Sequence, residues 1–131
     1  WLGAISDNIE ALHLDDHSPS GSIQYVKEKA NIQFKALNYI RGRSFQKSLI
    51  LIDECQNLTP YQMKAIITRA GEGSKVVCLG NLAQIDTPWL SATSSGLTYM
   101  CERFKGFRHG GHLRLQGVPR SVLAEYAEAN L

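Results

Sequence analysis

The sequence has no hydrophobic run long enough to cross a membrane and too few cysteines for a disulfide framework. Its longest uninterrupted aliphatic run is Leu49 to Ile52, whereas a transmembrane helix needs roughly 20 apolar residues. The first residues show no signal-peptide pattern. The three cysteines, Cys55, Cys78 and Cys101, lack a C-x-x-C spacing, which argues against a disulfide scaffold and against a zinc site. We therefore expect a soluble protein of the reducing cytoplasm, without a membrane partner.

A phosphate-binding loop of the form G-x-x-x-x-G-K-[ST] is also absent, because none of the 11 glycines is followed by lysine. Residues 71–75 resemble such a loop only loosely. They follow an expected helix and precede an expected strand, whereas a phosphate loop follows a strand and opens a helix. The chain begins on Trp1 and not on methionine, and we expect it to be an excerpt of a longer protein.

Length and composition fit one globular domain. The chain has 131 residues, of which 44% are apolar and 20% charged, as in ordinary globular proteins. The charge is uneven: residues 1–30 carry five acidic residues against two lysines, or −3, and residues 31–131 carry twelve basic against seven acidic residues, or +5. Basic clusters of this kind either contact phosphates or form a solvated surface. The two main clusters are Lys35, Arg41, Arg43 and Lys47, and Arg103, Lys105, Arg108, Arg114 and Arg120.

Hydrophobic patterning predicts alternating strands and helices. Leu49 to Ile52 and Val76 to Leu79 are apolar runs typical of strands buried on both faces. A helix that starts at Thr59-Pro60 and closes at Gly71 separates them. This alternation predicts an α/β domain of three layers with a mostly parallel sheet. The other expected elements are helices at 2–14, 22–29, 95–106 and 120–129 and strands at 32–36 and 112–115.

Polar residues follow both aliphatic strands, and parallel strands end at a common edge of their sheet, where ligands bind. Asp53 and Glu54 follow the first strand, as in many nucleotide triphosphatases, where Asp53 would bind the hydration shell of Mg²⁺ and Glu54 would orient the attacking water. Asn81 and Gln84 follow the second strand and would meet a γ-phosphate or that water. The alternatives are a pair of solvated acids and a polar turn that satisfies its own backbone.

A series of short motifs along nearly the whole chain is shared with one family. The motifs are Ile40-Arg41-Gly42-Arg43-Ser44, Leu51-Ile52-Asp53-Glu54-Cys55-Gln56-Asn57-Leu58-Thr59-Pro60, Gln62-Met63-Lys64, Thr68-Arg69, Gly71, Ser74-Lys75 and Gln84-Ile85-Asp86. Together they resemble the PhoH-like ATPases. Two residues depart from that pattern, Asn81 in place of aspartate and Cys55 in place of alanine.

The resemblance implies that residues 1–131 are the C-terminal portion of a single P-loop domain of the helicase-like branch. It implies ATP and Mg²⁺ as cofactors, a Walker B pair at Asp53 and Glu54, and a Walker A loop upstream of Trp1. The parent protein would hydrolyse ATP and couple this to RNA, as a helicase does. The chain alone, without the Walker A strand, loop and helix, is expected to be inactive.

Three arginines are further candidate site residues, and the resemblance implies a role for one of them, Arg120. Arg120 resembles a late Arg-Ser segment and is a candidate arginine finger that reaches a neighbouring subunit's nucleotide in a homo-oligomeric ring. Arg41 and Arg43 are candidates for binding RNA or nucleotide phosphates. The alternatives are a surface arginine at the start of a helix for Arg120 and pairing with local acids for Arg41 and Arg43.

Other interpretations stay open. The chain could be a non-catalytic RNA-binding or oligomerisation module in which the acids are inert. A metal-dependent nuclease using Asp53 and Glu54 is less favoured, since a two-metal site needs further ligands. Without a Walker A strand, the two aliphatic strands would either face a gap or be forced together. Trp89 and Tyr99 are interpreted as packing groups and not as base-stacking platforms.

Overall fold

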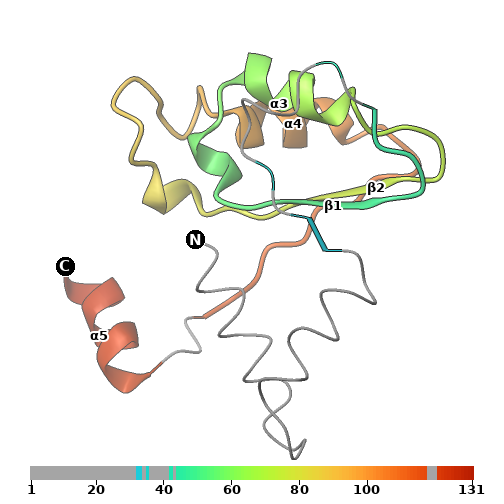
Figure 1. Cartoon of the computed structure of the whole chain (residues 1–131). Helices are drawn as coiled ribbons and strands as arrows, with labels where there is room; N and C mark the ends of the chain where they lie inside the picture. Colours follow the sequence, from blue (N-terminus) through green and yellow to red (C-terminus); the bar gives the residue numbers. More distant parts are fainter. Residues whose placement is uncertain (1–31, 34, 36–41, 43, 118–120) are drawn as a thin grey trace, which may run out of the picture. The chain divides into compact units, whose positions relative to one another are not determined.

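The computed structural model describes residues 32–33, 35, 42, 44–117 and 121–131. The chain divides into two compact units, Trp1–Arg43 and Ser44–Leu131, and all the described helices and strands belong to the second (Figure 1). None of the described helices is long and apolar enough to cross a membrane.

The described elements alternate along the chain as an α/β protein requires. In order they are strand β1 (Leu49–Ile52), 3-10 helix η2 (Cys55–Asn57), helix α3 (Pro60–Ile67), strand β2 (Lys75–Cys78), 3-10 helix η3 (Leu82–Gln84), helix α4 (Gly96–Phe104) and helix α5 (Val122–Asn130). Helix α5 follows residues 118–120, which are not described, and it is treated by itself.

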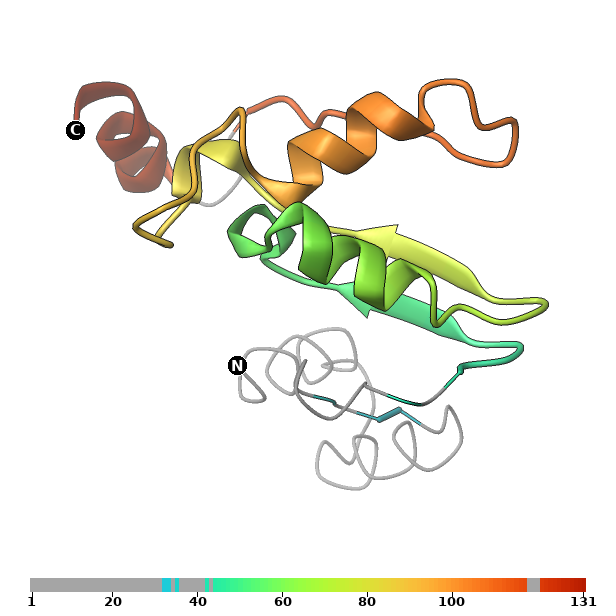
Figure 2. The same ribbon diagram turned by 90° about the horizontal axis from the view of Figure 1, so that it is seen from above.

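Strands β1 and β2 form a two-stranded parallel sheet, in which Leu49 lies opposite Lys75 and Ile52 opposite Cys78 (Figure 2). The predicted α/β class with parallel strands is therefore confirmed. The strands pair directly, so no gap separates them. Strand β2 begins and ends one residue earlier than the sequence predicts. The third layer and a wider sheet stay predictions.

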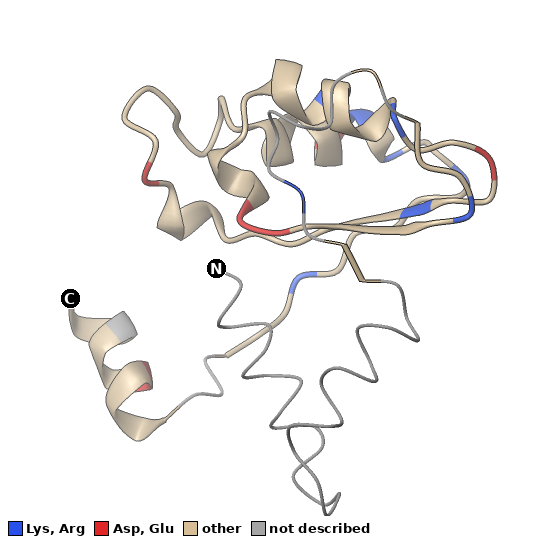
Figure 3. Cartoon of the chain, viewed as in Figure 1, with Lys and Arg blue, Asp and Glu red and all other residues tan. Residues whose placement is uncertain are grey.

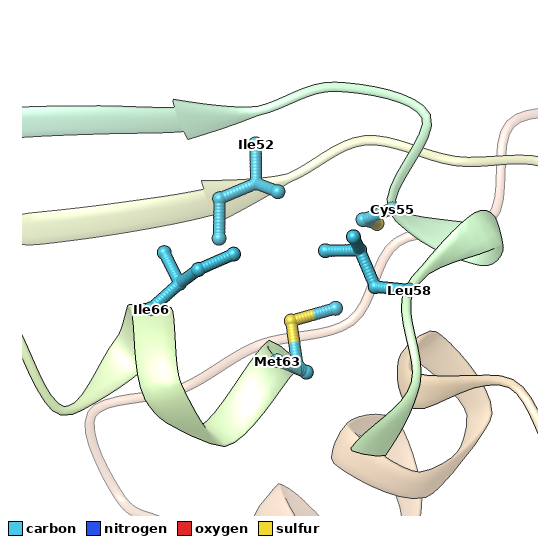
Figure 4. Close-up of a cluster of buried hydrophobic side chains, with 5 residues drawn as sticks. All are labelled: Ile52, Cys55, Leu58, Met63 and Ile66. Atoms are coloured by element: carbon cyan, nitrogen blue, oxygen red, sulfur yellow. The ribbon is translucent and has the colours of Figure 1, made fainter. Parts of the chain in front are cut away.

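Helices α3 and α4 lie over one face of this sheet (Figures 1 and 2). Helix α3 begins as predicted: Oγ1 of Thr59 accepts from the backbone N–H of Gln62, the Gln62 side chain accepts from the N–H of Thr59, and Pro60 occupies the first turn. Such reciprocal capping satisfies two otherwise unpaired helix N–H groups. The core between α3 and β1 consists of Ile52, Cys55, Leu58, Met63 and Ile66 (Figure 4).

On the other face of β1 the side chains are exposed in the described part of the chain, which corrects the prediction of a strand buried on both faces. Side chains alternate along a strand, so Ile52 is buried in the core while Leu49 and Leu51 are 64% and 62% exposed. In the described part of the chain, the packed helices cover only the face that carries Ile52. The aliphatic run therefore predicted the strand correctly, but the prediction that both faces of the strand are buried is wrong.

Three further predictions are corrected. The strand expected at 112–115 has no regular structure, and Leu113 and Leu115 are exposed, because a strand needs a neighbouring backbone to satisfy its hydrogen bonds. Helix α3 ends at Ile67 and not near Gly71. Helix α5 begins at Val122, with Ser121 as its cap, whereas the sequence places its start at about residue 120.

Several expected elements lie outside the described residues. These are the helices at 2–14 and 22–29 and most of the strand at 32–36. Within that last segment, Ile32, Gln33 and Lys35 are described and have no regular structure.

Candidate functional site

The candidate carboxylates lie at the carboxyl end of β1, in a turn with an unusual backbone. Glu54 adopts the left-handed conformation, with φ 51° and ψ 34°, and its N–H donates to Oδ1 of Asp53 at 3.0 Å. This conformation is uncommon for a residue with a side chain and persists where the surrounding structure imposes it. Asp53 is exposed and Glu54 is half-buried. The two neighbouring carboxylates therefore differ in their exposure to solvent.

The side chain of Gln56 fixes Glu54 to the loop that follows β2. Gln56 is fully buried, and its Nε2 donates to Oε2 of Glu54 at 2.5 Å and to the carbonyl of Gln84 at 3.1 Å. Its Oε1 accepts from the N–H of Asn81 at 3.2 Å. The carbonyl of Gln56 accepts from Oγ of Ser95, the cap of α4, at 2.8 Å. One residue therefore joins the loops that follow both strands, through its side-chain amide, to the start of a helix, through its backbone carbonyl.

Gln56 is a site residue that sequence reasoning did not assign. A buried amide must find partners for its donors and its acceptor, and here those partners are the candidate residues themselves. The available signal was its position, two residues after Glu54 within a turn that also contributes Cys55 and Leu58 to the core. Burial of the amide, however, follows from the packing of η2 and cannot be read from that position alone.

Asn81 and Gln84 are brought beside the β1 turn through their backbones. The Asn81 side chain caps η3, with Oδ1 accepting from the N–H of Ala83 at 3.0 Å, as expected of a polar turn that satisfies its own backbone. The carbonyl of Gln84 accepts from the side chain of Gln56, and the Gln84 side chain is exposed. Contact of either side chain with a nucleotide stays a prediction. The other predicted site residues, Arg41, Arg43 and Arg120, lie outside the described residues.

The environment of Asp53 suits a magnesium ion held together with a phosphate ligand. Among the described residues, no group of three or more His, Cys, Asp or Glu side chains lies close enough to hold a metal. Mg²⁺ usually keeps several waters and binds through one or two carboxylates and substrate phosphates. Asp53 is exposed, and its one hydrogen bond in this part of the chain comes from the neighbouring N–H. Asp53 can therefore offer one exposed carboxylate to such a metal, and its binding of Mg²⁺ stays a prediction.

Charge is distributed unevenly around the sheet. Asp and Glu residues occur in the loops that follow β1 and η3, and Lys and Arg are frequent near the opposite end of the strands, where the turn before β2 also carries Glu72 (Figure 3). Two cations of the second basic cluster have local partners: Lys105 pairs with Glu102 at 2.7 Å, and the Arg103 guanidinium lies 5.1 Å from the centre of the Tyr99 ring. Phosphate binding by this cluster stays a prediction.

The aromatic residues do not all pack as expected. Trp89 is 75% exposed, so its interpretation as a packing group is wrong. The reason is its position in a loop between η3 and α4, outside the regular elements that form the core.

The cysteines form a sulfur-rich part of the core near the site. The neighbouring Cys78 thiol, followed by burial, raises the pKa of the Cys55 thiol far above its ordinary range. The Cys55 thiol in turn lowers the pKa of Cys78. Cys78 also donates from Sγ to Sδ of Met100 at 3.6 Å. Cys55, found where the resemblance leads us to expect alanine, is thus a buried packing group.

These features define an α/β protein with a carboxylate pair at the carboxyl end of a parallel strand. The sequence matches the PhoH-like protein family over residues 3–127, so the chain belongs to the PhoH family and the resemblance seen in its motifs is confirmed.

Two curated relatives illustrate the match. The chain is 43% identical to Protein PhoH2 of Bacillus subtilis (strain 168) over 127 residues, which are 97% of this chain and 28% of the relative. It is 37% identical to Protein PhoH of Escherichia coli (strain K12) over 100 residues, 75% of this chain and 28% of the relative. The chain therefore spans little more than a quarter of the length of these relatives.

Proposed function

We propose that this chain is part of a longer PhoH-family protein that hydrolyses ATP, and that it carries the carboxylate half of the ATP site. In this proposal, Asp53 holds the hydration shell of Mg²⁺ and Glu54 orients and polarises the attacking water. The metal, when bound with the nucleotide, neutralises charge on the phosphates. Family membership and the carboxylate pair at the strand end support this assignment.

The observation that carries the proposal is the hydrogen bond between buried Gln56 and Glu54. A residue that activates water must be held in one orientation before the water arrives. Gln56 is itself fixed by the loop after β2, through Asn81 and Gln84. A group that senses the γ-phosphate would lie in that loop. A movement of the loop when ATP binds would therefore be transmitted through Gln56 to Glu54.

In this proposal a phosphate-binding loop comes from outside the 131 residues, since no glycine here precedes a lysine. That loop and its lysine supply much of the positioning of the β- and γ-phosphates. We therefore expect the isolated chain to release little or no phosphate at millimolar ATP and Mg²⁺. Robust turnover by the isolated chain that disappears in Asp53→Ala would contradict this part of the proposal.

Nucleotide titration of the longer protein, with and without Mg²⁺, separates the two carboxylate roles. Asp53→Ala should remove most of the gain in affinity that Mg²⁺ gives, whereas Glu54→Gln should leave binding nearly intact, because it preserves side-chain volume and does not touch the metal. Glu72→Gln is a matched control, because Glu72 is an exposed carboxylate in the turn that precedes β2. Equal binding defects in the Asp53 and Glu54 variants, with and without Mg²⁺, would contradict the assignment.

The arginines complete the proposal. In the longer protein, Arg41 and Arg43 would contact RNA or nucleotide phosphates, and Arg120 would act on a neighbouring subunit in a ring. The logarithm of RNA affinity should fall linearly with the logarithm of salt concentration. Charge reversal at Arg41 and Arg43 should make the slope of this line shallower by about one unit or more. An unchanged slope would make these two residues part of the solvated surface.

The role of Arg120 is tested by mixing two inactive proteins. Subunits with Arg120→Ala keep an intact Glu54, and subunits with Glu54→Gln keep an intact arginine, so mixed rings should contain some complete sites. An arginine supplied from a neighbour is worth about 10³–10⁵ in rate, so recovery should be easy to measure. No recovery, with subunit exchange shown to occur, would remove the arginine-finger role.

A further inference from the structure

A surface hollow of about 520 Å³ lies at the carboxyl end of the strands, outside the carboxylate pair. Its volume falls within the range of roughly 300–1,000 Å³ found for small-ligand sites. The residues that line it come from the end of η2, the start of α3 and the loop after η3: Asn57, Thr59, Gln62, Asp86, Thr87, Pro88 and Trp89. None of them belongs to the carboxylate pair or to the groups that Gln56 holds.

Hydrogen bonds hold the polar wall of the hollow in place. Oδ1 of Asn57 accepts from the N–H of Asp86 at 2.9 Å, and the Thr87 hydroxyl donates to the carbonyl of Asn57 at 3.4 Å. Thr59 and Gln62 are fixed to each other by the capping of α3. The loop that carries Trp89 is therefore tied to η2 a few residues before the indole.

The lining combines one large exposed ring with hydrogen-bonding groups and no cation. The Trp89 ring is 75% exposed, and Lys and Arg are absent from the residues that line the hollow. Within the described part of the chain, no hydrogen bond reaches the Asp86 carboxylate. A fitting ligand is thus flat, offers N–H or O–H groups to a carboxylate and carries no phosphate inside the hollow.

We propose that this hollow binds a nucleobase, stacked on the Trp89 indole. Asp86 would accept from an exocyclic amine or a ribose hydroxyl, and the amide of Asn57 or Gln62 would meet the edge of the base. Base stacking on an exposed aromatic ring tolerates any sequence, because every base has a π-face. The absence of lining cations favours a base of a single-stranded RNA, whose phosphates lie outside the hollow, over the base of a free nucleotide.

The hollow and the carboxylate pair share one short element. Consecutive residues of η2 serve the two places: Gln56 holds Glu54, and Asn57 holds the loop that carries Asp86 and Trp89. Binding of a base in the hollow would therefore affect the conformation of the turn that positions Glu54. The base site itself stands whether or not the chain belongs to an active ATPase.

Tryptophan fluorescence tests the site directly, because the chain has 2 tryptophans and Trp1→Phe leaves Trp89 alone. That variant of the full chain is titrated with a single-stranded RNA octamer, with an abasic octamer of the same charge, and with AMP and ATP. The RNA should quench the fluorescence, and the abasic strand should not. Quenching by AMP or ATP at the same base concentration would assign the hollow to the base of a free nucleotide.

Affinity for a fluorescently labelled octamer, measured by anisotropy, gives the size of the effect. Trp89→Ala should weaken binding roughly 5- to 150-fold, as expected for the loss of one stacked base, and Trp89→Phe should retain most of the affinity. Tyr126→Ala is the control, because Tyr126 is also exposed but lies on α5 and does not line the hollow. Circular dichroism confirms that each variant is folded.

Two results would overturn the base site. One is an abasic strand that binds as tightly as the octamer. The other is a folded Trp89→Ala variant with unchanged affinity. Octamer binding is measured without ATP or Mg²⁺, so a failure of the ATPase proposal can be distinguished from a failure of this one.

Discussion

Gln56 and Glu54 are joined by a hydrogen bond of 2.5 Å from Nε2 to Oε2, and Gln56 is completely buried while Glu54 is half-buried. The two residues are close in sequence, and the left-handed backbone of Glu54 allows its side chain to meet the amide. A carboxylate held in this way has little rotational freedom. The bond thus orients a half-buried acid at a strand end.

Replacing Gln56 with leucine should destabilise the chain strongly. The change removes three hydrogen bonds, those of Gln56 with the N–H of Asn81, the carbonyl of Gln84 and the Glu54 carboxylate, and each contributes about 0.5–1.5 kcal/mol. We expect a loss of about 3 kcal/mol in the free energy of unfolding, measured by urea denaturation. Gln62→Leu, at an exposed capping residue, should cost about 1 kcal/mol. Equal losses in the two variants would show that Gln56 does not join the loops.

Gly80 lies in the loop after β2, where an added side chain would press on the hydrogen-bonded Gln56. A Cβ atom there would lie 2.8 Å from Oε1 of Gln56 and 2.9 Å from Cδ2 of Leu97. Gly80→Ala should therefore lower stability by about 1–3 kcal/mol, the usual cost of overpacking. At Gly106, a Cβ atom would meet nothing within 4 Å, so Gly106→Ala is the matched control. A Gly80 variant as stable as this control would contradict the close packing.

The two half-buried thiols should ionise at different pH. The Cys55 thiol lowers the pKa of Cys78, and burial raises the pKa of Cys101. Because the thiolate is the reactive form, maleimide labelling of Cys78 should rise at a lower pH than labelling of Cys101. In Cys55→Ala the midpoint pH for labelling of Cys78, followed by mass spectrometry, should rise. If the midpoint pH for labelling of Cys78 is the same in that variant, Cys55 does not set the pKa of Cys78.

Local signals in the sequence predicted much of the described fold. The strand at Leu49–Ile52, the capped start of α3 and the start of α4 at Ser95 all match, because each is specified by neighbouring residues. The segment 112–115 has a strand-like pattern and no strand, because strand formation depends on a partner that the pattern does not reveal. The exposure of Leu49 and Leu51 has the same kind of cause, since covering a face depends on distant elements.

The candidate site was only partly predictable for the same reason. Asp53 and Glu54 could be proposed from their place after an aliphatic strand. The role of Gln56 and the exposure of Trp89 required knowing which loops pack together. Hydrogen bonds between residues 25 or more positions apart, such as those of Gln56 with Asn81 and Gln84, leave no local signal in one sequence.

Steady-state ATP hydrolysis by the longer protein with Glu54→Gln tests the central claim most directly. The substitution keeps the shape of the side chain and removes the carboxylate that would polarise the attacking water. Turnover should fall on the order of 100-fold or more, while ATP affinity measured in the same buffer stays nearly unchanged. Turnover within about twofold of the unmodified protein, with ATP bound normally, would contradict the assignment of Glu54 as the water-activating residue.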